Sequence, residues 1–222
     1  MCFYAVALNA QYYSQSGQDR YLNEHLFKGK RQGIFIDVGA HDGITYSNTY
    51  FFEKELGWNG ICIEPIPALF KRLQNSRRCM CLQGCISNKN EKSDFLCITS
   101  YIASEYTEML SGLWDSYDPR HIKRIDNEVA QFGGKKEIIE VQCYRLDHLF
   151  EQHNIMKIDY LSIDVEGAEM KVLESIDFTV IDIDVISIEN NYGTECIKQF
   201  LMKRGYQYII TLDGDEIYQK KR

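Results

Sequence analysis

The sequence of 222 residues predicts one α/β domain with a doubly wound, mostly parallel sheet and a closing antiparallel hairpin, a Rossmann-like architecture. Three observations predict this class. Short apolar runs typical of buried strands alternate with segments of helical period, and several of these runs end in an acidic residue. No Pro-, Gly- or Ser-rich linker divides the chain. A single domain over residues 1–222 is therefore expected.

The first part of the chain follows the pattern of a βαβ unit. Residues 33–38 (GIFIDV) predict a strand and residues 47–56 a helix, and GICIEP at 60–65 predicts the next strand. The elements expected after them are a helix over 68–74, a strand over 79–86 and a short strand over 94–98. The pattern then breaks, because residues 101–136 are polar and aromatic without clear strands. A segment of that length is typical of a functional insertion or lid.

The alternation resumes after this segment. The expected elements are a strand over 137–144, a helix over 146–153, a strand over 158–167, a helix over 168–176, a strand over 183–191, a helix over 195–204 and a hairpin of 206–212 with 216–219 across DGD. In an open parallel sheet the ligand binds at the carboxyl ends of the strands, near the point where strand order reverses. Asp37, Glu64, Asp164 and Glu189 all stand at such ends.

Composition excludes several classes of function. The formal net charge is −7 and the basic residues are scattered, which argues against a nucleic-acid partner. No apolar run approaches the roughly 18 residues of a membrane helix, and the opening MCFYAVALNA lacks the basic region of a secretory signal. The chain is expected to be soluble and cytoplasmic, although its start could be the cut edge of a longer polypeptide.

The eight cysteines are expected to be reduced, because they are spread through a chain of ordinary core-forming composition. Cys79, Cys81 and Cys85 have a spacing that zinc could use. They also share parity along an apolar run, so buried free thiols on one strand are the favoured interpretation.

The glycine-rich stretch after the first strand predicts a ligand-binding loop. Gly39 and Gly43 allow a sharp turn and a close approach to a ligand, while Asp37 and Asp42 flank that approach. A phosphate cradle would need positive charge, and this loop has none, so the bound group should be cationic. Glu64 stands where such folds use an acid to bind a ribose. Together these features favour S-adenosyl-L-methionine, the alternative being an ordinary strand-to-helix turn beside a surface glutamate.

Long ordered motifs extend this inference over nearly the whole chain. They are YSQSGQD (13–19), GIFIDVGAHDGITYSNTYFFEKELGWNGICIEPIP (33–67), SGLWDSY with HIKRI (111–125), IDYLSIDVEGAE (158–169) and ISIENNY (186–192). With them the sequence resembles the FkbM-type methyltransferase family. The resemblance implies a class I S-adenosylmethionine-dependent methyltransferase that acts on a hydroxyl group, often of a sugar or glycoside.

The resemblance also implies which residues bind the cofactor. Glu64 would bind the ribose, Ile86 and Ser87 would lie beside the adenine, and Gln15 and Gln18 would close over the methionine end. The cofactor loop would comprise Asp37, Gly39, Ala40, Asp42, Ser47 and Asn48.

The acidic ends of two later strands suggest a metal site. Asp164 ends one strand and Glu189 with Asn190 ends the next, and adjacent strand ends lie about 5 Å apart. Three oxygen ligands suit a hard divalent cation such as Mg²⁺ or Mn²⁺, an arrangement that resembles the metal site of catechol-type and metal-dependent sugar O-methyltransferases. The cation and Asp164 would activate a hydroxyl group and Glu166 would take its proton. Ordinary capping and turn roles for these residues are the alternative.

Further candidates lie elsewhere in the chain. His41, inside the cofactor loop, is an alternative base. In the insertion, Trp114, Tyr117, His121 and Arg124 could bind a sugar through stacking and hydrogen bonds, or could simply pack a lid helix against the domain.

The sequence thus predicts a metal-assisted O-methyltransferase for a sugar, glycoside or glycan acceptor, with the acceptor and the oligomeric state left open. Two rivals remain at this point. One is a non-catalytic cofactor- or nucleotide-binding module of the same fold, and the other is a metal-independent N- or carboxyl-methyltransferase.

Overall fold

The computed structural model describes residues 10–100 and 107–222, so the first six residues of the predicted insertion lie outside the described part. Its main sheet has seven strands in the order β10-β11-β9-β8-β1-β2-β3. Five of them are parallel: β1 (Ile34–Val38), β2 (Asn59–Glu64), β3 (Met80–Gln83), β8 (Lys157–Ile163) and β9 (Asp182–Glu189). The hairpin of β10 (Tyr206–Leu212) and β11 (Asp215–Lys220) closes the sheet antiparallel to β9. The predicted fold class is confirmed.

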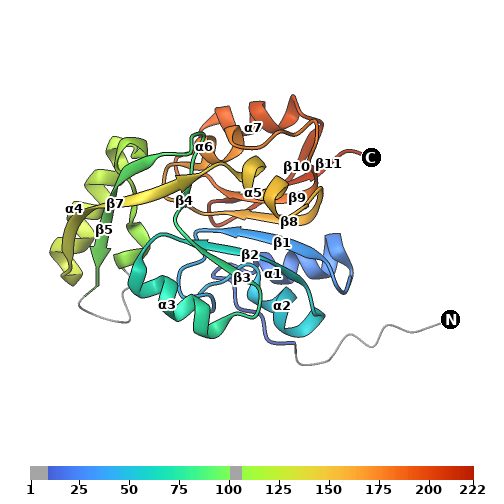
Figure 1. Cartoon of the computed structure of the whole chain (residues 1–222), viewed down its shortest axis with the longest axis horizontal. Helices are drawn as coiled ribbons and strands as arrows, with labels where there is room; N and C mark the ends of the chain where they lie inside the picture. Colours follow the sequence, from blue (N-terminus) through green and yellow to red (C-terminus); the bar gives the residue numbers. More distant parts are fainter. Residues whose placement is uncertain (1–9, 101–106) are drawn as a thin grey trace.

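Helices cover both faces of this sheet. Figure 1 shows α5 (Leu146–Gln152), α6 (Glu169–Glu174) and α7 (Glu195–Met202) on one side, and α2 (Tyr50–Leu56) and α3 (Pro67–Ser76) on the other. Alternate side chains of β1 explain the two cores: Ile36 and Val38 pack with the first group, while Phe35 packs with the second. In a doubly wound sheet, helices cover both faces, so each central strand must be apolar on both faces.

A second, four-stranded sheet was not predicted. It has the order β4-β7-β5-β6, with β4 at Cys85–Ile86, β5 at Lys92–Thr99, β6 at Gly112–Leu113 and β7 at Lys135–Tyr144. The single strand expected over 79–86 is wrong, because the chain leaves the main sheet at Gly84, whose φ is 150°. A Cβ atom at Gly84 would lie 2.7 Å from the carbonyl oxygen of Gln142, so only glycine fits this crossing.

The described part of the insertion is largely helical. It contains the 3₁₀ turns η2 (Thr107–Leu110) and η3 (Trp114–Ser116) and the helix α4 (Pro119–Phe132). Asp118 caps α4 by accepting a hydrogen bond from the amide of Arg120 at 2.8 Å. Figure 1 shows α4 with β5 and β7 standing beside the main sheet. The insertion is therefore not a loose loop, because the antiparallel pair of β5 and β7 joins its two ends.

The N-terminal segment carries the short helix α1 (Gln18–Tyr21) and the π-helical turn η1 (Leu22–Phe27), neither of which was predicted. Seven of the eight cysteines lie in the described part and all seven are free thiols. Cys79 and Cys85 are buried, whereas Cys81 is half-buried. The expectation that the three thiols share one strand is wrong, because Cys81 lies in β3 and Cys85 in β4 of the other sheet. Among residues 10–100 and 107–222, no helix combines the length and the apolar character needed to cross a membrane.

Candidate active site

A cleft of about 510 Å³ opens at the carboxyl ends of β1, β2, β8 and β9. Strand order reverses here, because β1 lies between β2 and β8, so the cleft occupies the position expected for a ligand. The predicted site residues that line it are Gln15, Gln18, Asp37, Gly39, Ala40, His41, Ser47, Asn48, Glu64, Ile86, Arg124, Asp164, Glu166 and Glu189.

The glycine loop is wedged between two strand ends. The amides of Gly39 and Ala40 donate to the carbonyl oxygen of Ile63 at 3.1 and 3.0 Å. Gly39 has a φ of 90°, and a Cβ atom there would lie 1.8 Å from the carbonyl oxygen of Asp164. Glycine is thus required by backbone packing, in addition to any approach by a ligand.

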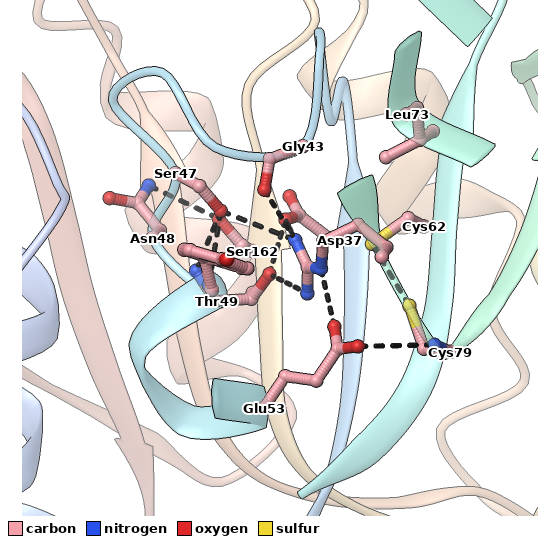
Figure 2. A network of polar contacts seen from close by, with 12 residues as sticks. Asp37, Gly43, Ser47, Asn48, Thr49, Glu53, Cys62, Leu73, Cys79 and Ser162 are labelled. Carbon is pink, nitrogen blue, oxygen red and sulfur yellow. Dashed lines mark hydrogen bonds and ion pairs between the residues drawn. The ribbon is translucent and has the colours of Figure 1, made fainter. Parts of the chain in front are cut away.

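Arg77, which sequence reasoning missed, forms buried hydrogen bonds to this loop and to the start of α2. Its Nη1 donates to the carbonyl oxygen of Gly43 at 3.1 Å and its Nη2 to Thr49 Oγ1 at 2.9 Å. Its Nε pairs with Glu53, and the side chain is completely buried. Figure 2 shows Gly43, Thr49, Glu53 and Asp37 converging on this network. An arginine just before a strand gave no sequence signal for this role.

Two predicted cofactor residues take part in the same network. Asp37 accepts a hydrogen bond from Thr49 Oγ1 at 2.5 Å and lies 3.8 Å from the Nη1 of Arg77. Burial raises the pKa of Asp37, and the Arg77 charge opposes that shift. Ser47 Oγ accepts from the amide of Tyr50 at 3.1 Å and so helps to begin α2. Both side chains therefore shape the loop as well as line the cleft.

Glu64 ends β2 with both carboxylate oxygens facing the loop and the following turn. Oε2 accepts from the amide of His41 at 3.0 Å and Oε1 from the amide of Ile66 at 2.8 Å. Burial outweighs these hydrogen bonds and raises the pKa of Glu64 to about 7. Each oxygen keeps a second lone pair, so Glu64 can still accept hydrogen bonds from a ligand.

His41 and Asp42 differ from their predicted roles. Asp42 Oδ1 accepts from the amides of Ile44 and Thr45 at 2.9 and 2.8 Å, which closes a turn outside the cleft lining. His41 lies between carboxylates, with Nδ1 3.6 Å from Asp42 and Nε2 3.6 Å from Glu108. Burial lowers the pKa of His41, but the neighbouring carboxylates of Asp42 and Glu108 outweigh it and raise the pKa to about 9. The raised pKa favours the protonated imidazole at neutral pH, a form with no free nitrogen to accept a proton.

One end of the cleft is apolar. Ile86 lines it, whereas Ser87 is buried outside the lining and donates its amide to the carbonyl oxygen of Tyr144 at 2.9 Å. Further apolar residues of the lining, here called the apolar wall, include Ile66, Leu69, Phe95, Leu110 and Leu113. Phe95 and Leu113 belong to the second sheet, so this wall depends on the unpredicted architecture.

Three carboxylates meet at the ends of β8 and β9. Asp164, Glu166 and Glu189 each have a carboxylate oxygen within 4.8 Å of the others. Glu166 has a φ of 55°, is 8 % exposed, and its Oε2 has no hydrogen-bond partner among the described residues. Burial and the neighbouring Asp164 raise the pKa of Glu166. Asp164 is exposed toward the cleft, but protein atoms enclose its other sides. This burial and the nearby charge of Asp215 raise the pKa of Asp164.

Asn190 is not part of this cluster. Its Nδ2 donates to the carbonyl oxygen of Thr194 at 3.1 Å and to Glu216 at 3.0 Å, and its Oδ1 accepts from the amide of Thr194 at 2.8 Å. The side chain therefore shapes the loop before α7, and its neighbour Asn191 lines the cleft instead. The carboxylate cluster at these strand ends therefore comprises Asp164, Glu166 and Glu189, because the chain turns back at Glu166, and the predicted Asn190 lies outside it.

The four predicted acceptor residues of the insertion do not form one surface. Arg124 lines the cleft and its Nε donates to Glu128 at 2.7 Å. His121 is buried behind the cluster, with Nδ1 3.5 Å from Glu166 Oε2 and its ring stacked on Tyr117 at 5.0 Å. Trp114 is 50 % exposed and, like Tyr117, lies outside the cleft lining, so an aromatic platform for a sugar is not formed there.

At the rim of the cleft, hydrogen bonds join the N-terminal segment to the turn between β10 and β11. Gln18 Nε2 donates to Asp215 Oδ2 at 2.9 Å, and Ser16 Oγ donates to Asp213 Oδ2 at 2.9 Å. Sequence reasoning used the DGD motif only as a hairpin turn, although two acids in it were a signal of a polar site.

The cleft is strongly acidic. Arg124 and the protonated His41 are its cationic side chains. Nine carboxylates line it, from Asp37, Glu64, Glu108, Glu128, Asp164, Glu166, Glu189, Asp213 and Asp215. Such a lining favours cationic ligands over anionic ones.

Comparison with known proteins shows several similarities. The sequence model of the family described as "Methyltransferase FkbM domain" matches residues 37–208. The curated relative "Methyltransferase 1" from Beauveria bassiana (strain ARSEF 2860) is 24 % identical over 191 residues, which cover 80 % of this chain and 73 % of the relative.

Two solved structures match this chain, and the first of them is similar to it in fold. One is a methyltransferase FkbM from Methylobacillus flagellatus KT, with a TM-score of 0.53 and 11 % identity over 93 % of this chain. The matched region is 48 % of that structure, so the chain spans about half its length. The other, a precorrin-6y C5,15-methyltransferase from Geobacter metallireducens GS-15, has a TM-score of 0.45 and 10 % identity, covering 92 % of this chain and 87 % of that one.

Proposed function

The chain belongs to the FkbM methyltransferase family, and from this premise we propose that it transfers a methyl group from S-adenosylmethionine to a hydroxyl group of a sugar, glycoside or glycan. One observation carries the proposal. The carboxylate cluster of Asp164, Glu166 and Glu189 lines the same cleft as the Gly39 loop and Glu64. Groups suited to activating a hydroxyl and groups suited to holding the cofactor therefore share one cavity.

The lining of the cleft fits the cofactor. Glu64 offers two oriented oxygens to the ribose hydroxyls, and Ile86 with its apolar neighbours offers a surface for the adenine. Gln18 and Asn48 offer polar groups to the methionine end. When bound, S-adenosylmethionine supplies an electrophilic methyl group on a sulfonium, and the acidic lining complements that positive charge.

The carboxylate cluster fits a hard divalent cation. Oxygen ligands on two neighbouring strand ends suit Mg²⁺ or Mn²⁺, and the unpartnered Oε2 of Glu166 is a polar atom for which a ligand would compensate. Three clustered, enclosed carboxylates repel one another unless a cation or protons offset their charge. A cation held there supplies a Lewis acid that lowers the pKa of a coordinated hydroxyl.

Glu166 is the residue that we assign to proton removal. Asp164 and Glu189 end their strands and would provide the fixed ligands, whereas Glu166 stands on a strained turn two residues later. The raised pKa of Glu166 makes its ionised carboxylate a stronger base than that of an exposed glutamate. His121, 3.5 Å from Glu166 Oε2, limits the positions that this side chain can adopt.

The test is incubation with labelled S-adenosylmethionine and a panel of free sugars, glycosides and glycans, with and without exhaustive chelation. Label in a sugar that disappears on chelation and returns with Mn²⁺ would support the proposal. Tight binding of S-adenosylhomocysteine without transfer to any acceptor would favour a cofactor-binding module. Transfer to an amine or carboxyl group that is indifferent to chelation would favour the metal-independent alternative.

A further inference from the structure

Glu108 of η2 reaches the cleft from the insertion, and the proposed function gives it no role. Its side chain lines the cleft and is 13 % exposed. Its Oε2 is buried and has no hydrogen-bond partner among residues 10–100 and 107–222. A buried carboxylate oxygen without a partner is costly, and such oxygens usually accept a hydrogen bond. The unpartnered atom therefore indicates a donor that belongs to a ligand.

The protein contacts of Glu108 leave this oxygen to a ligand. His41 Nε2 lies 3.6 Å from Oε1, so the histidine faces the other carboxylate oxygen. Burial raises the pKa of Glu108, but His41 and the hydroxyl of Ser100 outweigh it and lower the pKa. That hydroxyl is itself 2.7 Å from Thr107 Oγ1. An ionised carboxylate has acceptor sites alone, so the group that meets Oε2 must be a donor.

His41 connects Glu108 to the residue that we assign to the ribose. Its backbone amide donates to Glu64 Oε2 at 3.0 Å, while its ring faces Glu108. The two glutamates therefore contact the same residue of the cofactor loop, and both line the cleft. A base attached to a ribose at Glu64 can reach Glu108 without leaving this cleft.

The surroundings of Glu108 suit a flat ring with a polar edge. Leu110, two residues later on the same turn, belongs to the apolar wall. The polar neighbour Ser111 is already engaged, because its Oγ donates to the carbonyl oxygen of Glu108 at 2.6 Å and accepts from the amide of Ile98 at 2.9 Å. Four other members of the wall pack in one hydrophobic cluster, namely Ile66, Leu69, Phe95 and Leu113. A purine ring on this wall would thus meet an acceptor in Glu108 Oε2.

We propose that Glu108 is a specificity-determining residue for the cofactor, and that its Oε2 accepts a hydrogen bond from the 6-amino group of adenine. The inference rests on the proposed function and adds to it a residue of the insertion. The 6-amino group of adenine is a donor, whereas the 6-oxo group of hypoxanthine is an acceptor that an ionised carboxylate repels. A site built to bind a donor discriminates strongly against an analogue that lacks it.

The experiment measures binding by calorimetry, without an acceptor. The ligands are S-adenosylhomocysteine, its analogue with hydrogen in place of the 6-amino group, and S-inosylhomocysteine. The wild type should bind the first at least roughly tenfold more tightly than either of the others. Glu108→Ala should bring the affinities for S-adenosylhomocysteine and the deaminated analogue within about twofold of each other.

Two further variants sharpen the test. Glu108→Gln has an amide that can donate to a 6-oxo group, so it should bind S-inosylhomocysteine more tightly than the wild type does. Glu140→Gln removes an equal charge from an exposed pair with Lys92 in the second sheet, and should keep the wild-type preference. Thermal unfolding checks that each variant is folded.

A purely structural role for Glu108 gives a different result. If Glu108→Ala weakens S-adenosylhomocysteine and the deaminated analogue by the same factor, the residue packs the insertion and the inference is wrong. Equal affinities of the wild type for these two ligands would also overturn it, with cofactor binding still standing. Failure of the wild type to bind any of the three would count against the proposed function itself.

Discussion

The backbone of Gly39 is in direct contact with the backbone of Asp164, since a Cβ atom on Gly39 would lie 1.8 Å from the Asp164 carbonyl oxygen. This contact joins the cofactor loop after β1 to the end of β8, where the carboxylate cluster begins. The loop and the cluster are therefore packed directly against each other, and a change that separates them should affect both stability and ligand binding.

Gly39→Ala tests this contact. Gly57→Ala is the matched control, because Gly57 also has a left-handed φ, 68°, but has open space around its Cα. We expect the control to cost about 1–2 kcal/mol of unfolding free energy. Gly39→Ala should cost about 1–3 kcal/mol more through overpacking and should abolish binding of S-adenosylhomocysteine. Urea denaturation and calorimetry measure both, and similar stabilities for the two variants would contradict the contact.

Arg77→Lys tests the network beneath the loop. Lysine cannot reproduce the forked contacts of the Arg77 guanidinium with Gly43 and Thr49, and it leaves Glu53 with a poorer buried partner. We expect a loss of about 3–5 kcal/mol, the usual effect of breaking a buried ion pair. Arg78→Lys, the exposed neighbour, should leave the thermal midpoint unchanged. Equal thermal midpoints for the two variants would show that the contacts of Arg77 do not stabilise the fold.

The raised pKa of Glu64 predicts a pH-dependent cofactor affinity. The pKa is about 7 in the free protein against an ordinary value of 4.5, and ribose hydroxyls donate best to the ionised form. Affinity for S-adenosylhomocysteine should therefore rise from pH 6 to pH 8. Glu64→Gln should remove this part of the pH dependence and weaken binding by about 1.5–3 kcal/mol. An unchanged affinity in the folded variant would exclude Glu64 from the cofactor site.

The raised pKa of Glu64 has the opposite effect on the stability of the free protein, which should fall as the pH rises. Because the folded-state pKa of Glu64 lies above the unfolded value, its contribution is fully present below pH 4.5 and is lost as pH rises through about 7. The wild type should thus lose stability relative to Glu64→Gln between these pH values. Chemical denaturation at several pH values measures the difference.

The carboxylate cluster predicts a requirement for a divalent cation. Activity should vanish on chelation and return with Mg²⁺ or Mn²⁺, while S-adenosylhomocysteine should still bind the chelated protein. Glu166→Gln should retain the metal and lose turnover by about 10² to 10⁴, the usual contribution of a general base. Asp164→Asn should instead lower metal affinity. Full activity after exhaustive chelation would rule out the metal-assisted mechanism.

The insertion should act on the acceptor through Arg124. Arg124→Ala should raise the KM for the acceptor several-fold and leave the affinity for S-adenosylhomocysteine nearly intact, because Arg124 faces the cluster rather than Glu64. Arg120→Ala is the control on the same helix, since Arg120 lies over Tyr192 at 4.3 Å and does not line the cleft. Equal loss of both affinities in Arg124→Ala would indicate a packing role for α4.

Local patterns in the sequence determined the sheet and the strand-end residues. A strand such as Ile34–Val38 is predicted by its continuous apolar run. Its direction follows from the helix that returns the chain to the next strand. Because all parallel strands end at one edge, Asp37, Glu64, Asp164 and Glu189 had to lie near one another. Periodicity alone was enough for these conclusions.

Contacts between distant segments were decided only by the tertiary structure. Glu166 enters the cluster in place of Asn190 because of a left-handed backbone turn, which no residue pattern specified. Arg77 acquires its role by burial beneath a loop formed some 30 residues earlier, and Asp215 by a hydrogen bond to Gln18, 197 residues away. A sequence records which side chains a segment offers, whereas burial, charge and pKa depend on what packs against them. The strand-end carboxylates were therefore set by the sequence, and their partners by the fold.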